Sequence, residues 1–236
     1  MSHGPDPSTP DDLLGRLLAG QDPVDPAPSG RAEDRPTADV SVRPALPEDA
    51  ATIGDLHART LRATLAAGTG AELPAEVRDA VDGAALARSW RTAITSPPSD
   101  AHRVLSACAG PSVVGFAAIA PAEVPVPVAP ATAEGAAAPA PEEQDEPAPP
   151  AGTVGEILAL EVPAAHARSG HGSRLLAACV DLLREQGATR AQTWAVRDDE
   201  SRTRFLSSAG FAPVGVRRSL DVGGAEVVEI CWYAEL

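Results

Sequence analysis

A short turn with two glycines, placed where a helix is expected to begin, is the part of the sequence best suited to chemistry. The turn is Arg168-Ser169-Gly170-His171-Gly172-Ser173, and it follows an apolar run that ends at Val162. Glycines at the start of a helix let backbone N–H groups approach an anion, and the helix N-terminus adds a partial positive charge. The Arg168 side chain and the Ser173 hydroxyl can add direct contacts. The turn is suited to a pyrophosphate; a turn in which glycine only relieves strain is the alternative.

Two other phosphate-binding loops are excluded by the residues themselves. A Walker loop needs Gly-Lys-Ser/Thr, and the chain contains no lysine. The dinucleotide fingerprint needs a third glycine, and Leu175 stands where that glycine would fall. The absence of lysine also excludes a Schiff-base mechanism.

The cysteines predict neither a metal site nor a disulfide. Cys108, Cys179 and Cys231 lie far apart, each within an apolar run, and no Cys-x-x-Cys or Cys/His cluster is present. We therefore expect buried free thiols and no metal.

The hydrophobic pattern places the turn inside a mixed α/β domain with the order β-α-α-β-β-β-α-β-α-β-β. The expected strands are residues 40–43, 103–109, 112–120, 154–162, 189–197, 211–220 and 225–233. The expected helices are residues 47–67, a segment from Pro74 to just before Pro97, 170–187 and 198–209. The glycine turn thus connects the fourth strand to the helix that follows it.

Two segments differ in composition from this domain, which spans residues 40–236. Residues 1–39 form an acidic tail rich in Pro, Asp and Ser, and residues 121–151 form a Pro/Ala-rich insertion; both are expected to be disordered. Together they hold most of the net charge of −14, which argues against a nucleic-acid partner. No apolar run is long enough to cross a membrane and no secretory signal opens the chain, so a cytoplasmic location is expected.

The turn and the order of elements together resemble the GNAT superfamily of acyl-CoA-dependent N-acetyltransferases. The phosphate loop of that family reads Gln/Arg-x-x-Gly-x-Gly/Ala after a strand ending in Val, and Gly170-His171-Gly172-Ser173 matches its second half. Val42-Arg43-Pro44-Ala45 resembles the opening strand and Val113-Val114-Gly115-Phe116 the third strand. Residues 205–211, Phe-Leu-Ser-Ser-Ala-Gly-Phe, resemble the Phe-Tyr-x-x-x-Gly-Phe signature of the last helix.

The resemblance implies acetyl-CoA as cosubstrate and direct attack by an amine on its thioester. In the family, the fourth strand separates from the fifth, and the pantetheine arm lies in the gap like an added strand. Backbone groups near Leu160 and Val162 would hold that arm. Arg168, Ser169, Gly170, His171, Gly172 and Ser173 would hold the pyrophosphate.

The resemblance also indicates a general base. Acids early in the fourth strand often face the acceptor in this family, which makes Glu156 the first candidate. Strand alternation places Glu161 on the opposite face. His57 and His171 are alternatives, although the position of His171 between two glycines favours an exposed spacer. Trp90 is interpreted as a packing residue or as part of the acceptor cleft.

Three positions depart from the family pattern. Ala167 stands at the Gln/Arg position of the phosphate loop, Asp199 stands where Asn is frequent, and Leu206 stands where a tyrosine commonly protonates the leaving thiolate. The general acid is therefore not identified. These departures support an alternative reading, in which the chain binds acyl-CoA as a sensor or interaction module.

The sequence leaves the acceptor open among small polyamines, antibiotics, amino acids and protein N-termini. We expect either a small-molecule amine or a protein or peptide amine, and either a monomer or a homodimer.

Overall fold

The computed structural model describes residues 40–122 and 153–236. The tail over residues 1–39 and the insertion, apart from Pro121 and Ala122, lie outside the described residues, so the expectations for them stay predictions. The strands are β1 (Val40–Pro44), β2 (Arg103–Ala109), β3 (Ser112–Pro121), β4 (Thr153–Glu161), β5 (Ala188–Val196), β6 (Ala212–Val222) and β7 (Ala225–Glu235). The helices are α2 (Ala50–Thr69), α3 (Ala75–Ala80), α4 (Gly83–Thr95), α5 (His171–Glu185) and α6 (Glu200–Ser208), with short 3-10 turns η1 (Pro47–Asp49) and η2 (Ala164–His166).

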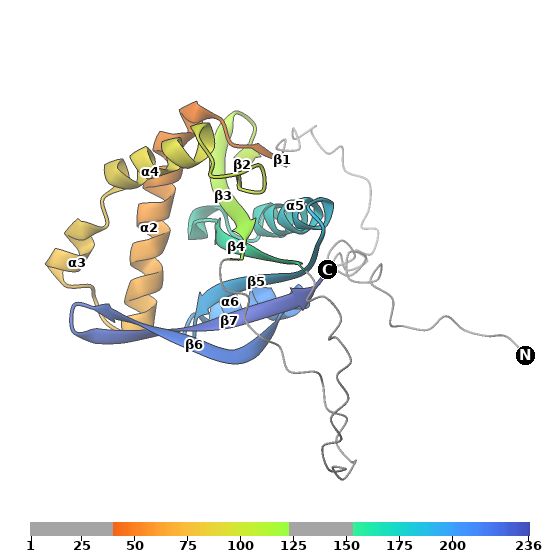
Figure 1. The fold of residues 1–236 in the computed structure, drawn as a ribbon. Helices are drawn as coiled ribbons and strands as arrows, with labels where there is room; N and C mark the ends of the chain where they lie inside the picture. Colours follow the sequence, from red (N-terminus) through yellow and green to blue (C-terminus); the bar gives the residue numbers. More distant parts are fainter. Residues whose placement is uncertain (1–39, 123–152) are drawn as a thin grey trace, which may run out of the picture.

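The seven strands form one mixed sheet in the order β1-β2-β3-β4-β5-β7-β6. Neighbouring strands are antiparallel except β4 and β5, which are parallel. Helix α5 covers one face of the sheet, and α2 with α4 covers the other (Figure 1). The predicted mixed α/β class is confirmed. Among the described residues, no helix is both long and apolar enough to cross a membrane.

The second predicted helix is in fact two helices. Val81 leaves the helical conformation, with φ −81° and ψ 76°, and the Asp82 carboxylate then accepts hydrogen bonds from the backbone N–H groups of Ala84 and Ala85. An aspartate in this position satisfies the free donors at the start of a new helix. The chain therefore turns at Asp82 and starts α4 in another direction.

Strand β4 contains a β-bulge at Leu158. Ala118 of β3 pairs with Ala159, and the next residue, Ile119, pairs with Ile157, so Leu158 has no partner in β3. An unpaired extra residue reverses the alternation of side chains beyond it. Ile157 and Leu160 consequently pack in the same core cluster beneath α5, although they are three positions apart in the strand.

Strands β4 and β5 separate beyond the bulge. Their parallel pairing runs from Thr153 to Ile157 on β4 and stops at Thr193 on β5, whose hydroxyl donates to the Ile157 carbonyl at 2.9 Å. Residues 159–161 of β4 then pair only with β3, and residues 194–196 of β5 pair only with β7. The sheet thus opens between its two parallel strands.

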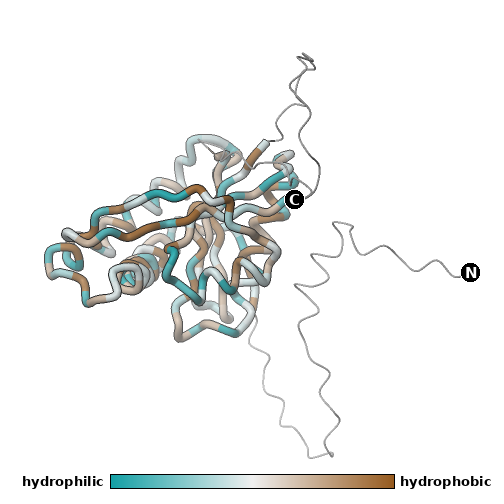
Figure 2. Tube along the Cα trace, turned by 90° about the horizontal axis from the view of Figure 1, so that it is seen from below, coloured by the Kyte–Doolittle hydropathy of each residue, from teal (hydrophilic) through white to brown (hydrophobic). Residues whose placement is uncertain are grey.

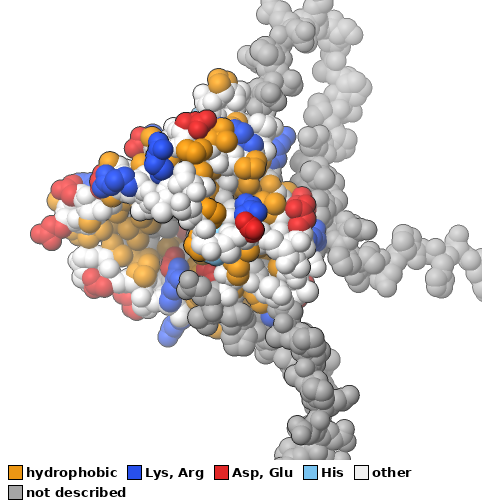
Figure 3. Space-filling model, turned by 45° about the horizontal axis from the view of Figure 1, so that its top comes forward, with side chains coloured by type: hydrophobic (Ala, Val, Ile, Leu, Met, Phe, Trp, Pro, Cys, Tyr) orange, Lys and Arg blue, Asp and Glu red, His pale blue; other side chains and the backbone are white. Residues whose placement is uncertain are grey.

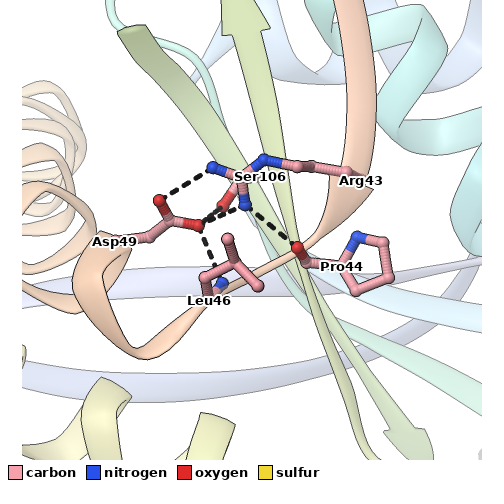
Figure 4. Close-up of polar contacts among 5 residues, drawn as sticks. All are labelled: Arg43, Pro44, Leu46, Asp49 and Ser106. Carbon is pink, nitrogen blue, oxygen red and sulfur yellow. Dashed lines mark hydrogen bonds and ion pairs between the residues drawn. The ribbon is translucent and has the colours of Figure 1, made fainter. Parts of the chain in front are cut away.

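A buried polar cluster fixes the other end of the sheet. The Asp49 carboxylate accepts two hydrogen bonds from the Arg43 guanidinium at 2.6 and 2.9 Å, one from the Ser106 hydroxyl at 2.9 Å and one from the Leu46 N–H at 2.8 Å (Figure 4). These contacts join β1, the start of α2 and β2. Burial alone would raise the pKa of Asp49, but the hydrogen bonds from Arg43, Leu46 and Ser106 lower it below its ordinary value.

The β6–β7 hairpin extends from the body of the sheet and reaches the far end of α2 (Figures 1 and 2). Its turn is Gly223-Gly224, and both residues have positive φ (63° and 88°), which glycine adopts without strain. Val222 and Val227 pack there in a small apolar cluster with Leu73. The hairpin predicted from this glycine pair is confirmed.

Candidate functional site

A cavity of about 270 Å³ lies where β4 and β5 separate. Figure 3, which tilts the top of Figure 1 toward the viewer, shows a hollow on the surface with apolar side chains inside and charged side chains at its rim. Residues from α2, β4, β5, α6 and the β6–β7 hairpin line the cavity. These residues are His57, Leu61, Thr64, Glu156, Ile157, Leu158, Ala159, Glu161, Trp194, Ala195, Val196, Asp199, Arg202, Arg218 and Glu229.

Glu156, the candidate base indicated by the family resemblance, lies in the cavity wall. The side-chain N–H of buried Gln192, on the neighbouring strand β5, donates to its carboxylate at 2.8 Å. This contact fixes one carboxylate oxygen and leaves the other able to accept a proton.

Glu161 lines the same cavity, so its predicted position on the opposite face is wrong. The bulge at Leu158 is the physical reason, because one extra residue brings Glu156, Ala159 and Glu161 to the α2 side of the sheet. Burial raises the pKa of Glu161 above its ordinary value, while Arg202 and the Thr60 hydroxyl act in the opposite direction. The cavity therefore contains two carboxyl groups in different environments.

The two arginines of the cavity both have partners. Arg202 on α6 crosses to β4, where its Nη1 donates a hydrogen bond to the Leu160 carbonyl. Arg218 on β6 donates to Glu229 at 2.6 Å and lies over the Trp194 ring, 4.4 Å from its centroid. Because Arg218 is neutralised by Glu229, the charges left to face the cavity are those of Glu156, Glu161, Asp199 and Arg202.

His57 on α2 packs against two aromatic rings that also contact each other. The centroids of Trp90 and Phe116 are each 5.5 Å from that of the imidazole, and the Trp90 indole N–H donates to Nδ1 of His57 at 3.1 Å. Burial lowers the pKa of His57. Trp90 is not among the residues that line the cavity, so it contacts His57 from the side away from the cavity.

The glycine turn has the backbone that an anion site requires. Gly170, at the N-cap of α5, has φ 77°, and the exposed Arg168 has φ 59°; both lie in the left-handed region. A Cβ on Gly170 would collide with Nη1 of Arg174, so this guanidinium lies directly against Gly170. Sequence reasoning missed Arg174, although side chains on a helix tilt toward its N-terminus and Arg174 lies one turn in. It brings to the turn the positive charge that Ala167 lacks.

His171 differs from its prediction as an exposed spacer, because it is only 3% exposed. It is the first residue of α5 and lies one turn before Leu175, on the face that packs against the sheet. Burial lowers its pKa, with His166 and Arg174 acting in the same direction. Within the part of the chain that the structure describes, its Nδ1 has no hydrogen-bond partner.

The turn and the cavity lie on two sides of α6. A Cβ on Gly172 would come within 3.8 Å of the Phe205 ring, and Arg202, one turn earlier on α6, lines the cavity. Leu160 near the end of β4 and Val162 just after it lead from the cavity toward the turn. The residues expected to hold an arm and a pyrophosphate therefore follow one another along one path.

The tyrosine position of the last helix is occupied by a core residue. Leu206 is 2% exposed and packs beneath α5, and Tyr233 lies on β7 under the Arg190 guanidinium. Among the described residues that line the cavity there is no tyrosine and no cysteine. Nor do the described residues contain a group of three or more His, Cys, Asp or Glu that could hold a metal ion.

Comparisons with known proteins agree with this geometry. The model of the acetyltransferase (GNAT) family matches residues 75–211. The fold is similar to that of a GCN5-related N-acetyltransferase from Rhodopseudomonas palustris, with 19% identity, a TM-score of 0.54, and coverage of 84% of this chain and 96% of the other. No curated protein matches the sequence.

Two further similar structures contain the cofactor. YncA from Salmonella typhimurium, a putative acetyltransferase with acetyl-CoA, has 16% identity and a TM-score of 0.53, over 84% of this chain and 94% of the other. PaiA N-acetyltransferase from Thermoplasma acidophilum, in complex with coenzyme A, has 13% identity and a TM-score of 0.53, over 84% and 99%.

Proposed function

The chain belongs to the GNAT acetyltransferase family, and from this we propose that it transfers an acetyl group from acetyl-CoA to a primary amine. The observation that supports the proposal most is the opening between β4 and β5, which holds two carboxyl groups and leads along β4 into the glycine turn. Two solved structures of similar fold carry coenzyme A or acetyl-CoA.

The residues of the turn fit a pyrophosphate. A side chain at Gly170 would be strained and would collide with Arg174, so the backbone there needs glycine and keeps a guanidinium beside it. The first N–H groups of α5 have no partner within the helix and face outward from its N-terminus. Arg168, Ser169, Gly170, His171, Gly172 and Ser173 would hold the pyrophosphate, the buried His171 through its backbone N–H alone.

The unpaired edge of β4 fits an extended arm. Leu160 and Val162 lie where β4 has lost its partner β5, so backbone groups there can bond to amides of a ligand as they would to another strand. The Leu160 carbonyl at present accepts from Arg202, and this bond would have to be exchanged for one to the ligand.

Glu156 is the proposed general base. The incoming amine is an ammonium ion at neutral pH and must lose a proton before its nitrogen can attack the thioester carbon. Glu156 takes this proton while Gln192 holds its carboxylate in place. The C–N bond forms, the C–S bond breaks, and the electron pair leaves with sulfur. Since a thiol has a pKa near 8–9, the thiolate can leave without a phenol to protonate it.

The test is steady-state release of free thiol from acetyl-CoA with a panel of primary amines. We expect Glu156→Gln to lower kcat by about 10²–10⁴-fold, with partial recovery at high pH as more of the amine is deprotonated without help. Glu235→Gln is the control, because Glu235 pairs with Arg190 on the exposed side of β5 and lies outside the cavity. Equal rates for wild type and Glu156→Gln would refute the role of Glu156.

A second candidate function is a binding module with little or no turnover. Two observations favour it: Arg202 occupies the Leu160 carbonyl, and Leu206 fills the tyrosine position with a core side chain. Thiol release separates the candidates, because both should bind CoA in calorimetry while a module releases no thiol with any amine of the panel. Gly172→Val is the negative control for binding, since a Cβ at Gly172 meets no protein atom closer than 3.8 Å but would stand at the anion-binding N-terminus.

A further inference from the structure

The protonation of the His57 ring is fixed by its neighbour. The indole nitrogen of Trp90 can only donate a hydrogen bond, and it donates to Nδ1 of His57 at 3.1 Å. Nδ1 must therefore keep its lone pair, and the proton of the neutral imidazole must be on Nε2. Phe116 and Trp90, whose own ring centroids are 5.0 Å apart, pack against the imidazole and restrict its rotation.

This tautomer decides what His57 can do. A neutral imidazole with its proton on Nε2 offers a donor there, and it has no free lone pair while the Trp90 contact lasts. Burial also favours the neutral ring, since it lowers the pKa of His57. His57 is therefore unsuited to be a general base and suited to be a hydrogen-bond donor.

The cavity around His57 is otherwise rich in acceptors. Glu156 is held by Gln192, Glu161 lies near Thr60 and Arg202, and no hydrogen bond joins either carboxylate to His57 among the described contacts. The carboxylates can receive the charged end of an amine. The donor that His57 contributes to the cavity needs an oxygen or another acceptor on the same ligand.

We propose that His57 is a specificity-determining residue that donates its Nε2–H to an oxygen of the acceptor substrate. The acceptor is then an amine that carries a carbonyl or hydroxyl oxygen near its amino group, because both groups must fit in a cavity of about 270 Å³. A polyamine without oxygen would leave this half-buried donor without a partner in the ligand, which costs binding. That the ligand is an amine rests on the proposed function. The tautomer of His57 does not depend on it.

The first experiment measures the tautomer by ¹⁵N NMR, which needs no substrate. The full-length protein at pH 7 should show His57 with a protonated Nε2 and an unprotonated Nδ1. Trp90→Phe keeps an aromatic ring but removes the donor, so the preference for Nε2–H should weaken. Trp194→Phe is the matched control, because the Trp194 indole lines the same cavity and lies against Arg218, while the hydrogen bond and ring contacts described for the His57 ring go to Trp90 and Phe116. A proton on Nδ1 in the wild type, or a doubly protonated ring, would overturn the proposal.

The second experiment measures binding of two probe amines by NMR titration in the presence of CoA. Alaninamide and 3-methylbutan-2-amine have the same number and branching of heavy atoms, but only alaninamide has a carbonyl next to its amine-bearing carbon. The Kd of 3-methylbutan-2-amine divided by the Kd of alaninamide should fall by about 3–10-fold from wild type to His57→Phe, which keeps the packing and loses the donor. Comparing ratios removes the effect of the different basicities of the two amines.

An unchanged ratio in His57→Phe would refute the role of His57 in selecting the acceptor. Failure of the proposed function looks different. In that case neither amine would release thiol, while the tautomer and the binding ratio would still follow the expectation.

Discussion

Asp49 and Glu161 are two carboxyl groups that the fold partly or wholly removes from water, and their pKa values move in opposite directions. The pKa of Asp49 is lowered because four hydrogen bonds, two of them from a guanidinium, outweigh the effect of burial. The pKa of Glu161 is raised because the effect of burial outweighs the lowering by Arg202 and Thr60. Hydrogen bonds to the charged form therefore decide whether a buried acid is held as a carboxylate that stabilises the fold, or has a raised pKa and can take up a proton more readily.

The difference follows from the places of the two groups in the sheet. Asp49 lies where β1 is paired along its whole length with β2, so three segments can each bring a donor to it. Glu161 lies where β4 has lost β5, and no strand edge is left on that side to supply a donor. The end of the sheet with complete pairing is the one held rigid, and the end with incomplete pairing carries the cavity.

Removing Asp49 should have the largest effect on stability. Asp49→Ala leaves the Arg43 guanidinium, the Ser106 hydroxyl and the Leu46 N–H without their common acceptor. We expect a loss of about 2–4 kcal/mol in the free energy of unfolding, measured by urea denaturation. Glu72→Ala, which breaks an exposed ion pair with Arg78, should cost less than about 1 kcal/mol. Equal losses for the two variants would mean that the buried cluster contributes no more than a surface pair.

The pH dependence of stability should have opposite signs for the two acids. The contribution of Asp49 is complete above its ordinary pKa of 3.8 and is lost as the pH falls through its lowered value. The contribution of Glu161 is complete below its ordinary pKa of 4.5 and is lost as the pH rises through its raised value.

Unfolding free energies measured from pH 2 to pH 7 check this opposition. Relative to wild type, Glu161→Gln should gain stability as the pH rises above 4.5. Asp49→Asn should lose stability relative to wild type as the pH rises toward 3.8. Parallel curves for Glu161→Gln and wild type would contradict the raised pKa of Glu161.

Removing Arg202 should have the smallest effect of the changes considered, and the quantity it changes is the affinity for CoA. Arg202→Ala frees the Leu160 carbonyl, so a ligand amide would no longer need to break an existing hydrogen bond. We expect CoA to bind about 3–10-fold more tightly by calorimetry. Arg204→Ala is the matched control, since Arg204 is exposed on the same helix and, among the described residues, forms its ion pair with Glu200. Weaker binding by Arg202→Ala would show that the guanidinium holds the ligand.

Much of the fold could be predicted because its signals are local. Alternating apolar residues marked the strands, and glycines such as Gly223 and Gly224 marked the turns. The break between α3 and α4 also had a local signal, the Asp82-Gly83 pair, which is typical of a helix start and was not used.

The site depended on contacts that no local pattern contains. The bulge at Leu158 arises from pairing with β3, and neither Leu158 nor its two neighbours is a glycine or proline that would mark it, so the face of Glu161 was predicted wrongly. The contact of His57 with Trp90 joins residues that are 33 positions apart. Arg202 reaches Leu160 across 42 positions. Such contacts are set by how α2, α4 and α6 pack on the sheet.

The bulge at Leu158 also determines how the length of β4 can vary. Deleting Leu158 would remove the bulge and restore strict alternation, and Glu156 and Glu161 would stay on one face because their partners in β3, Ala120 and Phe116, would not change. An insertion or deletion of one residue elsewhere between the two acids, with the bulge kept, would turn them to opposite faces. A relative whose strand has no bulge should therefore be aligned with a single gap at Leu158, since an alignment without that gap assigns one of the two acids to the wrong side of the sheet.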